Sequence, residues 1–383
     1  MSLYAKLHKA LREERWIREP TTSRPARLPA RRALCTCAAT LCASLLASPV
    51  LGAQGLTIRG FTDVSLLGNR RLGSPASTEA ASSSAFRLGQ FDLYLTSNIS
   101  DRLSILAETV FEYDDDAGEF VVDVERVLLG YALTNRIRVV AGKHHLPIGY
   151  WNNAYHHGEA LQPTIGRPLL FRFEDNGGVL PIHSTGVLLS ARDLTSRHIG
   201  FDALVSNSAG GSPDSDLASS KAVTLAVHSQ VTSALQVGVS AHHDHLSAGT
   251  PSRRGGTLQD DLRQQIVGGY AAFFGSRLEA VAEVQRMRER ALSGAKRRSD
   301  DRWSEGVAVY AGIRQGDLIP YFRYDELRTP ATDTYLPPGR IRVAGVGARY
   351  EYSALGVLKL EIRRRQAPGR RDVEFALQAA VGF

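Results

Sequence analysis

Cysteine is nearly absent from this chain of 383 residues, and the three that occur are Cys35, Cys37 and Cys42. All three lie in an N-terminal segment that has the layout of a cleavable leader. Removal of that leader would leave no cysteine, which excludes disulfides, thiol catalysis and cysteine-bound metals from the rest of the chain. The residue before Cys42 is Leu41 rather than a small residue, so we expect no lipid anchor.

Long apolar runs are also missing. After residue 53, no run reaches the roughly 18 residues that a membrane-spanning helix needs, so we expect no helical span in residues 54–383. This absence does not exclude a membrane protein. In a transmembrane β-barrel only every second residue faces lipid, so the average hydropathy is that of a soluble protein.

An excess of positive charge is confined to the first 53 residues. The formal net charge is +7, but residues 1–53 carry nine Lys or Arg against three Glu, and the remainder holds 37 basic and 36 acidic residues. The basic character therefore belongs to the leader. We expect no nucleic-acid partner.

Residues 1–53 have the layout of a secretory signal peptide. A basic region ends at Arg31 and Arg32, an apolar core runs from Ala33 to about Leu46, and small residues lead to an expected cleavage position after Ala53. The alternative is a retained membrane anchor. The short core, rich in Ala, Cys and Ser, disfavours it.

Familiar catalytic motifs are absent as well. The sequence contains no Gly-x-Ser-x-Gly elbow, no His-Glu-x-x-His and no Gly-Lys-Ser/Thr phosphate loop. A Ser-His-Asp grouping assembled from different strands stays open. We nevertheless expect no enzyme and no cofactor.

What the chain contains instead is alternation, most clearly in its last twelve residues. From Val373 to Phe383 every second residue is apolar, and the intervening residues are polar or small. A period of two places the two sets on opposite faces of a β-strand. Such a terminal strand, ending in Phe383, resembles the closing strand of outer-membrane barrels, where it also serves as the assembly signal. The alternative is an edge strand of a soluble sandwich.

The same pattern recurs along residues 54–383. It predicts about sixteen strands, at residues 56–66, 85–97, 102–113, 119–133, 136–143, 184–192, 197–206, 221–230, 234–245, 262–274, 277–288, 303–314, 318–327, 340–352, 355–365 and 371–383. Short turns alternate with mostly long polar loops between them. This regularity predicts an all-β, up-and-down antiparallel transmembrane barrel that follows the signal peptide.

The longest connection, residues 144–183, follows the fifth predicted strand. That strand ends in Gly142-Lys143, and Pro147, Gly149 and several aromatics follow. This arrangement resembles the porin-like barrels related to the phosphate- and pyrophosphate-selective porin family. In general porins the loop at this place folds into the barrel and narrows the pore. Phosphate selectivity does not transfer, because this loop is rich in His, Asn and aromatic residues.

The resemblance implies that this loop forms a constriction, and the alternation predicts which strand residues face the lumen. The candidate constriction residues are Lys143, His144, Tyr150, Trp151, Asn152, His156, Arg167, Arg172, Glu174 and Asp175. The candidate pore-lining residues are Arg314, Arg323, Arg349, Lys359, Glu361, Arg363 and Glu374. With Asp325 and Glu351 included, the basic lining residues exceed the acidic ones by one, which weakly favours anions.

Two histidine groups offer an alternative interpretation as metal sites. His144-His145 and His156-His157, together with His183, could supply imidazole ligands, and so could residues 242–245. Neighbouring residues on an extended chain point in opposite directions, however, so only one of each pair can face a given point. We expect no metal site. Asp114-Asp115-Asp116 could bridge lipopolysaccharide phosphates through divalent cations, but we favour the interpretation as a solvated charge run.

The sequence thus predicts an outer-membrane porin, a passive diffusion channel for small hydrophilic solutes or ions. The expected partners are outer-membrane lipid and lipopolysaccharide, the barrel-assembly machinery and the solutes themselves, and likeness to porins implies a homotrimer. One alternative is a plugged barrel that acts as a surface-binding or structural protein. Another is a soluble secreted binding protein.

Overall fold

The computed structural model describes residues 54–71, 82–114, 118–155, 162–173, 178–208, 220–292 and 301–383. The expected signal peptide, residues 1–53, lies outside these ranges. So do Asp115, Asp116 and three of the candidate constriction residues, His156, Glu174 and Asp175.

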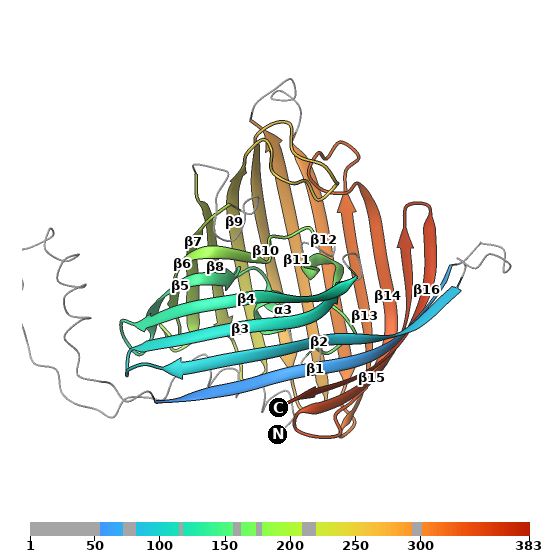
Figure 1. Cartoon of the computed structure of the whole chain (residues 1–383), viewed down its shortest axis with the longest axis horizontal. Helices are drawn as coiled ribbons and strands as arrows, with labels where there is room; N and C mark the ends of the chain where they lie inside the picture. Colours follow the sequence, from blue (N-terminus) through green and yellow to red (C-terminus); the bar gives the residue numbers. More distant parts are fainter. Residues whose placement is uncertain are drawn as a thin grey trace, which may run out of the picture.

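Sixteen antiparallel strands form a closed barrel in which β1 pairs with β16 and every other strand pairs with its neighbours in sequence (Figure 1). The strands are β1 (Gln54–Arg71), β2 (Ser82–Asn98), β3 (Leu103–Asp114), β4 (Glu119–Ala132), β5 (Ile137–His145), β6 (His183–Ala191), β7 (Ile199–Ser206), β8 (Ala222–Gln230), β9 (Leu235–Leu246), β10 (Leu262–Phe274), β11 (Leu278–Ala291), β12 (Arg302–Ile313), β13 (Leu318–Thr329), β14 (Gly339–Tyr350), β15 (Gly356–Ala367) and β16 (Arg370–Gly382). The prediction of an up-and-down antiparallel β-barrel of about sixteen strands is confirmed.

The alternation of the sequence explains which side of each strand faces out. On β16, Phe375 and Leu377 are exposed on the outside of the barrel, whereas Asp372 and Gln378 are buried on the inside. Large exposed apolar side chains recur on the outer face around the whole barrel. A closed sheet leaves no unpaired edge, so its apolar exterior can face hydrocarbon with every backbone group paired.

The last residue takes part in closing the barrel. The backbone N–H of Gly60 donates to the Phe383 carbonyl at 3.0 Å, and the Phe383 N–H donates to the Gly60 carbonyl at 2.9 Å. The Phe383 ring stacks on Phe91 with 5.8 Å between centroids. Inside the barrel, the Gln378 amide donates to Asp63 at 3.0 Å. The C-terminal strand is therefore fixed to β1 and β2 on both faces.

The strand boundaries agree with the predicted ones within a few residues, and the largest difference occurs in the first hairpin. There β1 and β2 continue to Arg71 and from Ser82, which shortens the connection between them to residues 72–81. Serine and charged residues have little intrinsic preference for strands. The extension follows from backbone pairing instead, because Arg71 pairs with Asp372 of β16 and Arg70 pairs with Ser82.

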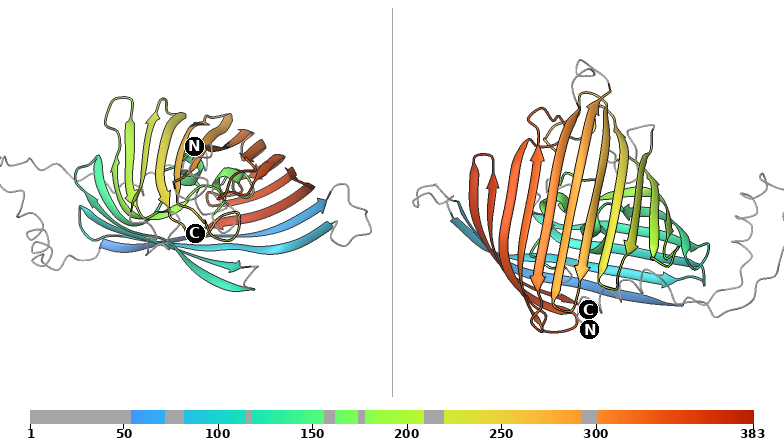
Figure 2. Two further views of the ribbon diagram at one scale, coloured as in Figure 1. Left: turned by 90° about the horizontal axis from the view of Figure 1, so that it is seen from above. Right: turned by 180° about the vertical axis from the view of Figure 1, so that it is seen from behind.

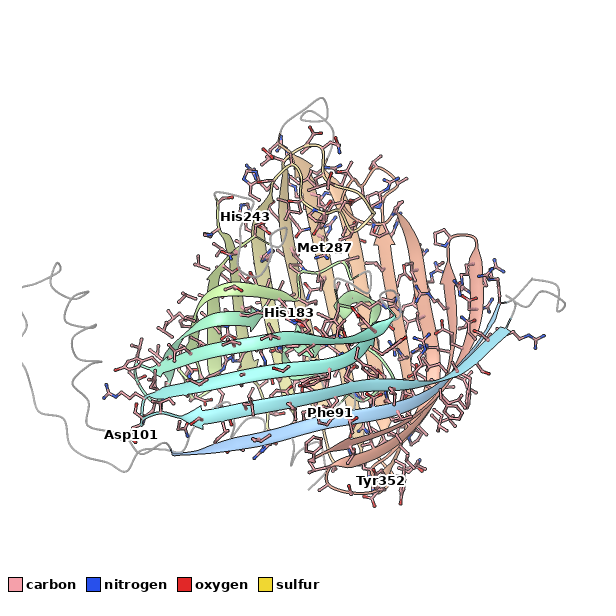
Figure 3. All side chains as sticks on the ribbon, viewed as in Figure 1. Phe91, Asp101, His183, His243, Met287 and Tyr352 are labelled. Carbon is pink, nitrogen blue, oxygen red and sulfur yellow. The ribbon has the colours of Figure 1, made fainter. Side chains whose placement is uncertain are left out.

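The two ends of the barrel differ. At one end, called the turn end here, short turns such as residues 99–102 and 275–277 join the strands. At the other, the loop end, lie most of the long connections, including residues 146–182 and 247–261. In Figure 3, His243 lies near the loop end of β9 and Tyr352 lies in the turn after β14. Within the described ranges, no helix is long and apolar enough to cross a membrane.

Candidate functional site

The connection between β5 and β6, called the third loop here, lies inside the barrel. Figure 2 shows its green ribbon within the curve of the sheet when the barrel is seen from above. It contains a short helix, α3 (Tyr150–Ala154), and a 3₁₀ turn, η2 (Leu169–Phe171). Both contribute buried side chains to an apolar cluster shared with inward-facing residues of the wall, including Met287 and Tyr310.

The 3₁₀ turn packs closely against β12. Leu170 and Phe171 are completely buried, and the Leu170 side chain occupies the space that a side chain at Gly306 would need. A Cβ atom on Gly306 would lie 2.1 Å from Leu170 Cδ2. Glycine at this lumenal position therefore lets the loop reach the backbone of the wall.

A carboxylate of β11 holds the start of α3. Glu283 accepts hydrogen bonds from the backbone N–H groups of Tyr150 and Trp151, both at 2.7 Å. These N–H groups belong to the first turn of α3 and have no partner within the helix. Gly149 precedes the helix with a φ of 69°, a conformation that favours glycine, and a Cβ there would lie 2.4 Å from the Glu283 carboxylate.

Side chains of β13 and β15 form hydrogen bonds with the peptide groups around Ile165. The Ile165 carbonyl accepts from Arg323 at 3.0 Å and from Arg363 at 3.1 Å. Its N–H lies 3.3 Å from the Glu361 carboxylate, to which it donates. Lys359 donates to the neighbouring Thr164 carbonyl at 3.2 Å. Ion pairs of Arg323 with Asp325 and of Arg363 with Glu361 and Glu374 keep these charges compensated.

A second charged cluster lies nearer the turn end. Arg349 pairs with Glu279 at 2.8 Å and with Glu351 at 3.1 Å, and Arg314 pairs with the same two carboxylates. The Tyr310 hydroxyl donates to Glu279 at 3.0 Å. Two guanidinium groups thus meet two carboxylates, so the buried cluster has no net formal charge.

Arg167 stabilises the loop internally. Its guanidinium group donates to the carbonyls of Phe171 and Tyr155 and to the Asn152 side chain. It also lies 4.4 Å from the centroid of the Phe173 ring, within the range of a cation–π contact. The Asn152 amide donates to the Leu146 carbonyl at 3.0 Å. The loop therefore has its own folded structure in addition to its contacts with the wall.

The predicted pore-lining residues lie on the inner face of the wall, but most of them do not line open space. Arg323, Arg349, Lys359 and Glu361 are at most 3% exposed. They are covered because the third loop packs on them and uses their charges as hydrogen-bonding partners. Most of the residues in the predicted balance of five basic to four acidic lining residues are therefore buried and ion-paired. This balance gives no measure of ion selectivity.

The described contacts of the third loop are mainly with β10 to β15, although its apolar cluster also includes Leu204 of β7 and Leu246 of β9. On the opposite part of the inner wall burial varies. Asp92 of β2 and Glu108 of β3 are fully buried, whereas the inward-facing Tyr94 and Leu106 are partly exposed.

Three solved structures illustrate what this arrangement is similar to. The anion-selective porin from Comamonas acidovorans is 12% identical, covers 86% of this chain and 99% of its own, and has a TM-score of 0.59. The outer membrane channel DcaP of Acinetobacter baumannii is 10% identical, covers 87% and 98%, and has a TM-score of 0.57. OmpT of Vibrio cholerae, an outer membrane protein in a trimer form, is 10% identical, covers 86% and 99%, and has a TM-score of 0.56.

The chain has the porin fold. At such low identities the likeness concerns the fold alone. No family description matches the sequence, and no curated protein matches it. The relation to phosphate- and pyrophosphate-selective porins is therefore not established.

An arginine group lies between the third loop and the inner face of β15. Arg172 of the loop lies near Arg363 and Arg365 of β15 and near Arg323. Burial, together with these neighbouring positive charges, lowers the pKa of Arg172 to about 10, so it stays charged at neutral pH. Within the described ranges, neither Arg172 nor Arg365 has a carboxylate in ion-pair distance.

Two other candidate constriction residues lie in β5, at the start of the loop. The Lys143 ammonium group donates to the Val124 carbonyl of β4 at 2.6 Å and lies 3.6 Å from Asp123. His144 is buried, with its Nε2 atom 3.3 Å from the Gly186 carbonyl. Both side chains therefore contact neighbouring strands. Among the described residues, no three His, Cys, Asp or Glu lie close enough to hold a metal ion.

Sequence reasoning missed Glu283 and Tyr310 as site residues. Both were visible as inward positions of alternating strands, and Glu283 belongs to a polar face with Glu279 and Gln285. Nothing in the sequence indicates that two backbone N–H groups more than 130 positions away would pair with Glu283. This pairing can be recognised only from the position of the third loop inside the barrel.

Proposed function

We propose that the chain is an outer-membrane channel of the porin type, through which small hydrophilic solutes or ions diffuse passively. The observation that carries this proposal is the one-sided packing of the third loop. A loop that filled the bore would cover both sides of the inner wall. The described contacts of this loop are mainly with β10 to β15, and Tyr94 and Leu106 on the opposite wall are partly exposed among buried neighbours, which supports a constriction rather than a plug.

We further propose a preference for anions. Support comes from Arg172 and Arg365, which carry positive charge on the lumenal side without a carboxylate in ion-pair distance among the described residues. In a narrow water-filled space, unpaired fixed charges favour mobile ions of the opposite sign. The anion-selective porin from Comamonas acidovorans is a structural neighbour that fits this preference.

The outer surface supports the proposed location. Exposed Leu, Val and Phe side chains cover the outside of the barrel, and a sheet without free edges suits a hydrocarbon environment. The proposed partners are outer-membrane lipid and lipopolysaccharide, the transported solutes, and the barrel-assembly machinery, which would recognise the strand that ends in Phe383. A homotrimer is proposed because a similar barrel is described in a trimer form. We propose no catalytic role.

Planar-bilayer recording tests this function. The refolded chain should produce stepwise conductance, and under a salt gradient its reversal potential should have the sign of anion preference. Protein that is β-rich and heat-modifiable on gels, yet gives no conductance, would contradict a channel and favour the plugged, surface-binding alternative. A reversal potential with the sign of cation preference would contradict the proposed anion preference but not the channel itself.

A further inference from the structure

A belt of arginines follows part of the outer face at the loop end of the barrel. Its members occupy outward positions on β10, β11 and β13 to β16: Arg263, Arg286, Arg288, Arg290, Arg328, Arg340, Arg342, Arg364 and Arg371. No Lys contributes to it. We call this set the arginine belt.

The strand pairing brings members of the belt side by side, although β12 contributes none. Arg290 lies opposite Arg263 across β10 and β11, and Arg328 lies opposite Arg340 across β13 and β14. Arg286 lies opposite Glu305 of β12. Placing two like charges directly opposite each other in a sheet is unfavourable unless something outside the strands compensates them.

The belt lies just beyond the apolar part of the outer face. Along β14, the outward positions change from exposed Val346 through Ala344 to Arg342 and Arg340 toward the loop end. On β15 they change from exposed Ile362 to Arg364. In transmembrane barrels the apolar band is about 25 Å tall and ends at the lipid headgroups. The arginines therefore occupy the headgroup level.

Carboxylates compensate only part of the belt. Arg286 pairs with Glu305, Arg288 with Asp301, and both Arg340 and Arg342 with Glu326. The other five arginines have no carboxylate within ion-pair distance among the described residues: Arg263, Arg290, Arg328, Arg364 and Arg371.

Aromatic residues share this level. The Arg286 guanidinium carbon lies 4.1 Å from the Trp303 ring centroid, and Trp303 is partly exposed on the outer face of β12. Aromatic rings with a polar edge are enriched where lipid meets water. On β2 to β4 the loop end instead carries exposed Phe86, Tyr113 and Phe120 on its outer face. The arginines are therefore confined to one part of the circumference.

We propose that the arginine belt binds the phosphate groups of a phosphorylated lipid in the outer leaflet, of the lipid A type. Guanidinium groups donate bidentate hydrogen bonds to phosphate, and the adjacent apolar band accommodates the acyl chains of the same molecule. Neither feature alone would select such a lipid. This surface is separate from the lumen and adds a lipid-binding role to the proposed channel, on whose membrane placement it rests.

Two matched variants of the full chain test the belt. The first replaces four unpaired belt residues by glutamine: R263Q, R290Q, R328Q and R371Q. The control replaces four exposed arginines of the turn end: R102Q, R136Q, R197Q and R277Q. The measurement is the affinity of bisphosphorylated lipid A for the purified barrel in detergent micelles containing EDTA, followed by native mass spectrometry. Heat-modifiable gel mobility verifies that both variants fold.

The wild type and the control should bind lipid A equally, and the belt variant should bind it roughly tenfold or more weakly. Dephosphorylated lipid A should bind weakly to all three proteins. Equal affinity of the belt variant and the control would overturn the proposal, and so would a loss of wild-type binding in EDTA, which would mean that divalent cations carry it. Displacement of lipid A by millimolar inorganic phosphate would indicate a free-anion site and contradict lipid binding. None of these binding results depends on whether the barrel conducts ions.

Discussion

The two faces of strand β14 carry arginines that have opposite surroundings. Arg349 points inward, is 3% exposed and pairs with Glu279 and Glu351. Arg342 points outward near the loop end and pairs with Glu326 at 3.3 Å. The first belongs to a buried network under the third loop, and the second belongs to a basic surface that faces the lipid headgroup level. The same residue type therefore has an architectural role inside and a surface role outside.

This difference has an energetic origin. A charge removed from water is stable only when it is paired and hydrogen-bonded, so truncating one member of a buried pair leaves the other uncompensated. An exposed ion pair gains little, because water and salt screen it. The inner charges should therefore control the stability and shape of the lumen, and the outer charges should control encounters with the membrane.

The largest expected effect comes from substituting Arg349. Arg349→Gln should lower the free energy of unfolding by about 3–5 kcal/mol, because Glu279 and Glu351 lose a buried partner. The matched change on the same strand, Arg342→Gln, should cost under about 1 kcal/mol. Urea unfolding in detergent, followed by tryptophan fluorescence, measures both. Equal losses for the two variants would break the contrast between the two faces.

A smaller effect is expected at Glu283. Glu283→Gln should lower the free energy of unfolding by about 2 kcal/mol, because each oxygen of Glu283 accepts from one of the N–H groups of Tyr150 and Trp151, and glutamine replaces one of these oxygens by an NH₂ donor. The start of the third loop should also loosen, which should raise the single-channel conductance or its noise. Glu305→Gln on the outer face of β12 is the control. An unchanged current from the Glu283 variant would mean that α3 does not limit the open path.

The smallest expected effect concerns selectivity. The double variant R172Q/R365Q should lower the anion-to-cation permeability ratio by roughly twofold, because it removes two fixed positive charges from the lumenal side. R328Q/R371Q removes the same charge from the outer belt and should leave the ratio unchanged. Reversal potentials under a salt gradient give both values. A shift of equal size in the outer variant would place the selective charges outside the lumen.

The barrel was predictable from the sequence because alternation acts locally. The apolar Leu377 and the polar Gln378, for example, indicate which face of the strand points outward and which points inward. Sixteen strands with this alternation, joined by connections of alternating length, are compatible with few other folds. The role of each inner charge was not predictable. The sequence predicts that Lys359 lines the pore. In the structure Lys359 instead donates a hydrogen bond to the carbonyl of Thr164, 195 positions away. The outer arginines were equally visible in the sequence, but their placement side by side depends on the register between strands.

The position of the third loop is tested most directly by a cross-link between Leu170 and Gly306. The close approach of these two residues places their Cβ atoms within reach of a disulfide. In a chain with Cys35, Cys37 and Cys42 replaced by serine, the variant L170C/G306C should form a disulfide on mild oxidation of the folded barrel, while conductance persists. Absence of the disulfide in folded, heat-modifiable protein would contradict a third loop fixed against β12. A disulfide accompanied by complete loss of current would contradict an open path beside the loop.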